Sequence, residues 1–179
     1  MDCNTTPLAD RLAEAKIDTL KEIIRNAESF LSGQLTSGLA SNQRALTLTS
    51  VLAAATVVLG GATATLLVGA TPNPPLAAIC GLVTAGFLVS MGLAISAAKP
   101  ADWYLAGNTP ASWVEDVELG KILERSLAEQ ASWYADMIAD NHATMERADD
   151  MIILALEFAW GSIAMGCILC GVLSGLLIN

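Results

Sequence analysis

Three long runs of apolar residues constrain this chain more than any other feature. They cover residues 45–70, 76–98 and 151–179, and Glu157 is the single charged residue within them. A hydrocarbon core about 30 Å thick is crossed by roughly 20 apolar helical residues, because each residue rises about 1.5 Å. Apolar runs of roughly 10–14 residues are typical of buried helices in soluble proteins. We therefore predict three transmembrane helices and favour them over three buried helices of a soluble bundle.

The distribution of basic residues predicts how these helices are oriented. All 9 Lys and Arg lie before the first run or between the second and the third, whereas the TPNPP turn at 71–75 and Asn179 carry none. Lys and Arg are enriched in the loops that stay in the cytoplasm. The asymmetry predicts a cytoplasmic N-terminus and an external C-terminus, as expected of a multi-pass protein of the bacterial inner (plasma) membrane.

These observations predict an all-α membrane protein in five parts. The parts are a cytoplasmic amphipathic helix (1–44), transmembrane helices (45–70 and 76–98), a cytoplasmic interfacial loop with helices (99–150), and a third transmembrane helix (151–179). Apolar residues recur at heptad spacing before the first run and again before the third. The first set is Ala13, Ile17, Leu20, Ile24, Ala27 and Leu31, and the second is Leu127, Ala131, Tyr134, Ile138, Asn141, Met145, Ala148 and Ile152. We expect these two helices to pack side by side as a cytoplasmic bundle.

The segment KPADWYLAGNTPASWVED (99–116) joins the second run to the next helix. Aromatic rings settle at the headgroup level of a bilayer, so Trp103, Tyr104 and Trp113 are interpreted as interfacial anchors, with Trp160 as a further belt residue. A nucleotide-binding loop is the alternative, although the segment has no phosphate-cradling glycine repeat. Thr109 followed by proline predicts a helix start, and a chain-length argument predicts a break near Gly120.

No arrangement of catalytic residues emerges, so the chain is not expected to be an enzyme or to hold a cofactor. Cys167 and Cys170 form a C-x-x-C pattern inside the third run, and no second such pair is present. The sequence contains a single histidine, His142. A structural zinc site needs four ligands, and these residues do not supply them. We therefore interpret the two cysteines as small packing residues. The acidic surplus of residues 102–150 disfavours nucleic-acid binding.

Small and mildly polar residues form stripes on two of the predicted spans. On the first span they are Thr49, Thr56 and Thr63, and on the third span they are Gly166, Cys167, Gly171 and Gly175. Small residues let helix backbones approach closely in lipid. The stripes therefore favour packing within the chain, a subunit interface or a polar pore lining. Asn141, on the heptad seam, either fixes register and oligomeric state or is simply tolerated there.

Acidic residues gather near one face of the third long helix. Glu146, Asp150 and Glu157 would form an acidic vestibule in a ring of subunits and would favour cations. The alternative is a solvated or arginine-paired helix end, because the third run is longer than the bilayer requires.

The order of parts resembles small bacterial membrane proteins of the Pycsar-effector and SLATT type. The stretches that carry the resemblance are ESFLSGQLTSGLASNQRALTLTS (28–50), KPADWYLAGNTPASW (99–113) and SWYADMIADNHATMERADDMI (132–152). The resemblance implies an antiphage effector that impairs the inner membrane when a cytoplasmic partner or nucleotide signal triggers it. A separate nucleotide-sensing domain is not evident in the sequence, and few basic residues are placed to meet a phosphate, namely Lys121, Arg125 and Arg147.

The expected function is therefore an oligomeric membrane effector that impairs the bilayer or conducts ions, with the lipid bilayer, further copies of the chain and a cytoplasmic signalling protein as partners. Two other classes stay open. A constitutive small ion channel would conduct without a trigger, and a non-conducting scaffold or assembly subunit would show no conductance at all.

Overall fold

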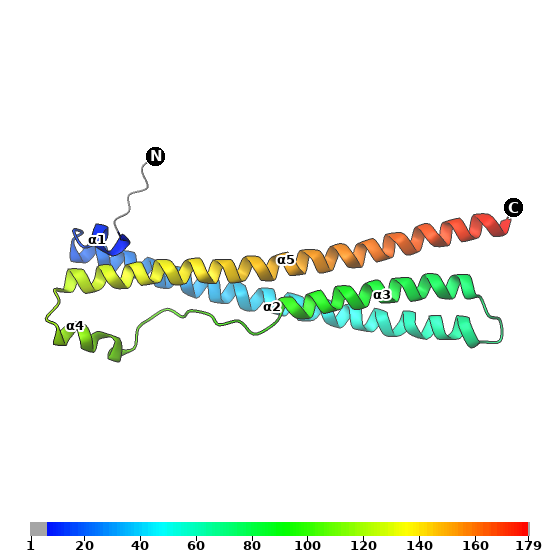
Figure 1. The fold of residues 1–179 in the computed structure, drawn as a ribbon, viewed down its shortest axis with the longest axis horizontal. Helices are drawn as coiled ribbons and strands as arrows, with labels where there is room; N and C mark the ends of the chain where they lie inside the picture. Colours follow the sequence, from blue (N-terminus) through cyan, green and yellow to red (C-terminus); the bar gives the residue numbers. More distant parts are fainter. Residues whose placement is uncertain (1–6, 179) are drawn as a thin grey trace. The chain divides into compact units, whose positions relative to one another are not determined.

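The computed structural model describes residues 7–178, so Cys3 and the ends of the predicted 1–44 and 151–179 segments lie outside the described residues. Residues 7–178 form helices and connecting segments and contain no strand (Figure 1). The elements are α1 (Leu8–Leu12), α2 (Ile17–Val68), α3 (Pro74–Ala97), the 3-10 helix η1 (Pro110–Trp113), α4 (Val114–Glu118) and α5 (Leu123–Ile178). The predicted all-helical class is confirmed for these residues.

The described residues divide into two compact units, each of which uses part of α2 and part of α5. The first, named here the polar unit, consists of residues 7–39 and 101–145, and the second, the apolar unit, consists of residues 40–100 and 146–178. The sequence suggested a boundary after residue 44, but α2 is one helix that contains both the amphipathic segment and the first apolar run. α5 likewise contains the second seam and the third apolar run.

The heptad seams form the core of the polar unit, as predicted. Leu20, Ile24 and Leu31 of α2 pack with Leu127, Ala131 and Tyr134 of α5, and all are buried. Ala13 precedes α2, in the turn that follows α1, and still packs against this cluster. Burial of an apolar stripe on each of two helices is what drives such a pair together in water.

A break separates α4 from α5 where the sequence predicted it. Gly120 has a φ of +63°, a left-handed conformation that glycine adopts without steric cost. η1 begins at Pro110 with Thr109 before it, as predicted, although the Thr109 hydroxyl bonds the Ser112 hydroxyl at 3.1 Å and caps no backbone N–H. Residues 110–118 thus form a short 3-10 helix followed by a short α-helix. The chain can then turn at Gly120 without steric cost.

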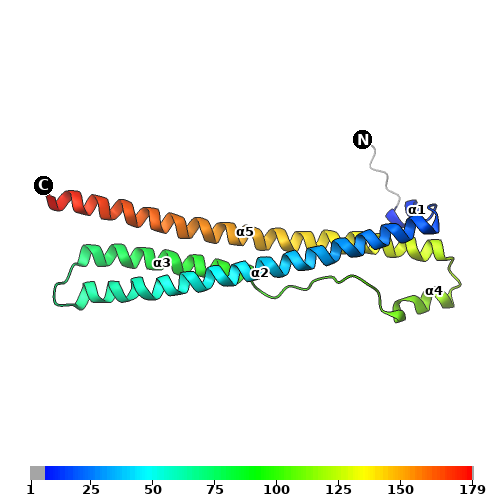
Figure 2. The same ribbon diagram turned by 180° about the vertical axis from the view of Figure 1, so that it is seen from behind.

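The apolar unit begins with a helical hairpin at the TPNPP turn. α2 ends at Val68 and α3 begins at Pro74, with Asn73 as its N-cap. The Asn73 side chain accepts a hydrogen bond from the Leu76 N–H at 3.2 Å, which satisfies a donor that has no partner within the helix. The predicted proline-closed hairpin is confirmed, and both views show α3 beside the second half of α2 (Figures 1 and 2).

Small residues allow α3 and α5 to approach closely in the apolar unit. A Cβ built on Gly86 would collide with the Ser162 side chain, and one built on Gly166 would stand 2.7 Å from a methyl group of Val83. The buried Ser90 hydroxyl donates to the backbone carbonyl of Ala155 at 2.5 Å. Leu52, Phe87 and Ala159 complete a small apolar cluster from three helices.

Three helices of the described residues, α2, α3 and α5, are long and apolar enough to cross a membrane. Their outward surface is rich in exposed leucine, valine and isoleucine, for example at Val58, Val68 and Leu176. Such a surface is stable in lipid and is a liability in water. The structure therefore supports the prediction of a membrane protein with three spanning helices.

Candidate functional site

A groove in the apolar unit contains the acidic residue that the sequence singled out. It lies between α3 and α5 and has a volume of about 630 Å³. Its lining is apolar apart from Glu157 and Ser162. The Ser162 hydroxyl donates to the Phe158 carbonyl at 2.7 Å, so Glu157 is the group in this groove whose polar atoms have no protein partner.

Glu157 is exposed on α5, and its carboxylate has neither a hydrogen bond nor an ion pair among residues 7–178. Asp150 and Glu146 are also exposed on α5. Separations of four and seven residues bring side chains to about the same face of a helix, as the sequence predicted for these acids. Arg147 lies beside Glu146 in the sequence, and α5 carries no arginine or lysine after it.

The three threonines of the predicted stripe on α2 have different surroundings, and Thr63 faces the hairpin partner α3. The Thr49 and Thr63 hydroxyls donate to the carbonyls four residues earlier, at 2.9 and 2.8 Å. A methyl group of Thr63 lies 3.7 Å from where a Cβ of Gly81 would stand, so this threonine faces α3. Thr56 differs, because its hydroxyl oxygen is buried and has no hydrogen-bond partner among the described residues.

The predicted oligomer-packing residues separate into two groups. Gly166 is buried against Val83 of the same chain, so it serves packing within the chain, which the sequence left open. Cys167, Gly171 and Gly175 are exposed, and a Cβ on either glycine would meet nothing within 4 Å. These three residues leave a small-residue stripe on the outer face of α5.

Asn141 has a third role that neither sequence interpretation contained. It is buried in the polar unit, where its Nδ2 donates to the Tyr104 carbonyl at 3.1 Å and its Oδ1 accepts from the Tyr104 N–H at 3.0 Å. Both hydrogen-bonding groups of this amide therefore hold the backbone of the 101–109 connection. Asn141 acts within one chain in this structure.

The aromatic residues of the connection are partly occupied by the polar unit itself. The Trp103 ring lies against Gly38 of α2, where a Cβ would approach it to 2.5 Å, and Trp113 packs against the heptad core. Tyr104 is exposed, and Trp160 of the apolar unit is exposed as well. Their assignment as interfacial anchors stays a prediction, and Trp103 and Trp113 have packing roles in addition.

Tyr134 holds the same connection further along. Its hydroxyl accepts from the Gly107 N–H at 3.1 Å and from Gln130 at 3.2 Å, and it donates to the Glu28 carboxylate at 2.9 Å. Burial is the main cause that raises the pKa of Tyr134 above its usual value. The phenol therefore stays protonated and joins α2, α5 and the connection.

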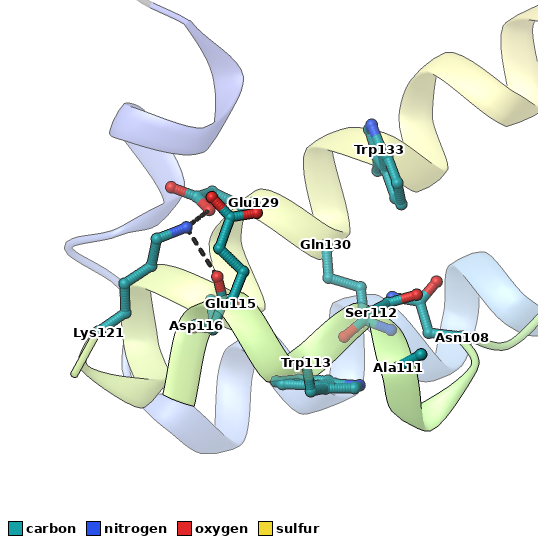
Figure 3. A pocket seen from close by; sticks show the side chains of 11 residues that line it. Asn108, Ala111, Ser112, Trp113, Glu115, Asp116, Lys121, Glu129, Gln130 and Trp133 are labelled. Carbon is teal, nitrogen blue, oxygen red and sulfur yellow. Dashed lines mark hydrogen bonds and ion pairs between the residues drawn. The ribbon is translucent and has the colours of Figure 1, made fainter. Parts of the chain in front are cut away.

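A cavity of about 420 Å³ in the polar unit was not anticipated from the sequence. It is lined by the segment that contains η1 and α4 and by the first turns of α5 (Figure 3). Two indole rings line it, Trp113 from η1 and Trp133 from α5. The lining residues come together in the folded chain from different elements. No local sequence pattern predicts that they do so.

Ion pairs connect the two walls of this cavity. The Lys121 ammonium lies 2.7 Å from Asp116 and 2.9 Å from Glu129, and Arg125 bridges Glu129 and Asp10. Lys121 lowers the pKa values of Asp116 and Glu129, and these carboxylates, Asp116 first, raise the pKa of Lys121 to about 12. Asp116, Glu129 and Lys121 therefore stay charged at neutral pH.

Among the described residues no group of His, Cys, Asp and Glu is placed to hold a metal ion, and Cys80, Cys167 and Cys170 are free thiols. Comparison of the chain with protein-family models, with curated proteins and with solved structures found no match. The functional argument therefore rests on the geometry of the chain itself.

Proposed function

We propose that this protein is an oligomeric effector of the bacterial inner membrane that admits cations and so impairs the membrane, in the manner implied by the Pycsar-effector and SLATT resemblance. The single observation that carries the proposal is Glu157, an exposed carboxylate without a protein partner on an apolar helix. In the proposed orientation the N-terminus and the polar unit are cytoplasmic.

The cost of an acidic side chain in lipid is the physical basis of this proposal. Placing a carboxylate at the centre of a spanning helix costs roughly 2.5–3.5 kcal/mol on insertion scales, and such residues generally face a bundle interior or a hydrated cavity. Glu157 lines a groove that is open at the surface of the apolar unit. Assembly of several copies around this face would hydrate the carboxylate in a shared interior.

The outer stripe of Cys167, Gly171 and Gly175 supports assembly independently. Exposed small residues at four-residue steps allow two helices to approach closely in a bilayer. Thr56 supports a polar route, since its buried hydroxyl has no hydrogen-bond partner among the described residues and water would satisfy it. A ring of carboxylates at such a route would raise the local concentration of cations.

Membrane potential in expressing bacterial cells tests the proposal. We expect induction of the protein to depolarise the cells, and Glu157→Gln to reduce the depolarisation while leaving assembly in detergent unchanged. Glu118→Gln is the matched control, because Glu118 is an exposed acid of α4 in the polar unit. Cells that stay fully polarised while they express the parent protein together with its proposed cytoplasmic signalling partner would contradict the proposal and favour a scaffold subunit.

Orientation is tested by labelling with an impermeant maleimide. Thr71 is an exposed residue of the hairpin turn that makes no cap, so Thr71→Cys is preferable to a cysteine at Asn73, which would remove the N-cap of α3. We expect intact cells to label Thr71→Cys, and Cys3 to react only after permeabilisation. Labelling of Cys3 in intact cells would reverse the proposed orientation.

A further inference from the structure

The cavity between the 110–118 segment and α5 has the composition of a ligand site. At about 420 Å³ it falls within the range of small-molecule pockets, roughly 300–1,000 Å³. The indoles of Trp113 and Trp133 provide apolar faces with a negative electrostatic potential. Asn108, Ser112 and Gln130 add neutral polar groups to the same lining.

The charges of the lining favour a cation. Three carboxylates, Glu115, Asp116 and Glu129, and one ammonium, Lys121, line the cavity. Lys121 is held by Asp116 and Glu129 (dashed lines in Figure 3). The Glu115 carboxylate has no ion-pair or hydrogen-bond partner among the described residues, so its negative charge is available to a ligand. An anion would meet this surplus of carboxylates and gain no additional ammonium.

We propose that this cavity binds a small organic cation, of which a quaternary ammonium compound is the type, with its charged group against the indoles of Trp113 and Trp133 and near the carboxylate of Glu115. Indole is the aromatic ring that attracts such cations best, and quaternary ammonium groups are recognised by aromatic surfaces because their methyl groups weaken hydration. The remaining polar part of the ligand would meet the amides of Asn108 and Gln130.

This site lies wholly within the polar unit, so the proposal does not rest on ion conduction by the apolar unit. A protein that conducts no ions would still bind the cation, and a conducting protein with an empty cavity would leave the proposed function intact. The two proposals therefore stand or fall by different measurements.

Choline and its neutral isostere 3,3-dimethylbutan-1-ol are the probes that test the proposal. The full chain is purified in a maltoside detergent, which carries no ammonium group, and tryptophan fluorescence is followed during titration. We expect choline to give a saturable change and the neutral isostere to bind at least about tenfold more weakly. A tenfold difference is about 1.4 kcal/mol, which is the size of a cation–π contribution.

Three variants assign the site. We expect Trp133→Leu and Glu115→Gln each to weaken choline binding several-fold, because they remove a ring and a compensating charge from the lining. Both side chains are exposed, so the fold should tolerate the changes, whereas Trp113 is left in place because it packs on the core. Trp160→Phe is the control, since Trp160 belongs to the apolar unit and should not alter choline affinity.

Several outcomes would overturn the proposal. Equal affinity for choline and the neutral isostere would show that the cavity does not recognise charge. A linear, non-saturating response would show that no site exists. Binding of adenosine monophosphate in preference to choline would assign the cavity to an aromatic anion instead.

Discussion

The polar unit fills its core with large side chains such as Leu20, Leu31 and Tyr134, whereas the apolar unit brings α3 and α5 together at Gly86 and Gly166. In water, burial of large apolar side chains drives helix association. In lipid the surroundings are as apolar as the helices, so close backbone approach and interhelical hydrogen bonds take over. The same long helices, α2 and α5, therefore carry two packing strategies along their length.

The largest effect is expected from the core of the polar unit. Leu31 is 0% exposed, and Leu31→Ala should lower the free energy of unfolding by about 2–5 kcal/mol, because it leaves a cavity. The matched control is Leu39→Ala on the same helix, where the parent side chain is 58% exposed and the loss should be within about 0.5 kcal/mol. Thermal unfolding in detergent measures both variants. Equal losses of stability in the two variants would contradict the idea that buried large side chains hold the polar unit together.

Overpacking the apolar unit should have the next largest effect. Gly86→Ala places a Cβ against Ser162 and should destabilise by about 1–3 kcal/mol, because α3 and α5 must move apart. Gly92→Ala, in the same helix, is the control, since a Cβ there meets nothing within 4 Å. Ser162→Gly should restore the stability of Gly86→Ala, and failure of this rescue would assign the loss to another contact.

Loss of the Tyr134 hydroxyl should destabilise the 101–109 connection, with a smaller effect than the two changes above. Tyr134→Phe removes three hydrogen bonds, including the one from the Gly107 N–H, and typical bonds of this kind contribute about 0.5–1.5 kcal/mol. Amide hydrogen exchange over residues 101–109 should become faster. Tyr104→Phe makes the same chemical change at an exposed ring, and exchange that responds equally to both variants would contradict this role of Tyr134.

The smallest effect concerns pH. The folded-state pKa values of Asp116 and Glu129 are lowered, so their contribution to stability is complete above their ordinary values of about 4 and is lost as pH falls through the lowered values. The pKa of Lys121 is raised to about 12, so its contribution is complete below about 10.5 and is lost as pH rises toward 12. We expect Glu129→Gln to flatten both limbs of a melting-temperature profile, and an unchanged profile would show that the network is fully screened.

Much of the fold could be predicted because its signals are local. Heptad spacing located both faces of the polar core, the proline cluster at 71–75 located the hairpin, and Gly120 located the break before α5. Each signal lies within a few neighbouring residues. Over such short distances the spacing of apolar residues and the presence of proline or glycine directly indicate the backbone conformation.

The sites were less predictable because they depend on contacts between distant segments. Asn141 and Tyr104 are separated by 37 residues, and their pairing uses the backbone of Tyr104, which no side-chain pattern reveals. The chain has 14 glycines, so the two that let α3 and α5 approach could not be told from the others. Trp133 and Glu129 lie on α5 and line a cavity only because residues of η1 and α4 lie beside them.

The pairing of Asn141 with Tyr104 has a consequence for mutational tolerance. Asn141 contacts the main-chain N–H and C=O of residue 104, groups that nineteen of the twenty amino acids present alike, while the ring of Tyr104 itself is exposed. The contact with Asn141 is thus compatible with any residue at position 104 except proline, which has no N–H to donate. Variation can accumulate at position 104 while the path of the connection stays fixed, so this position is free to acquire new surface chemistry without refolding.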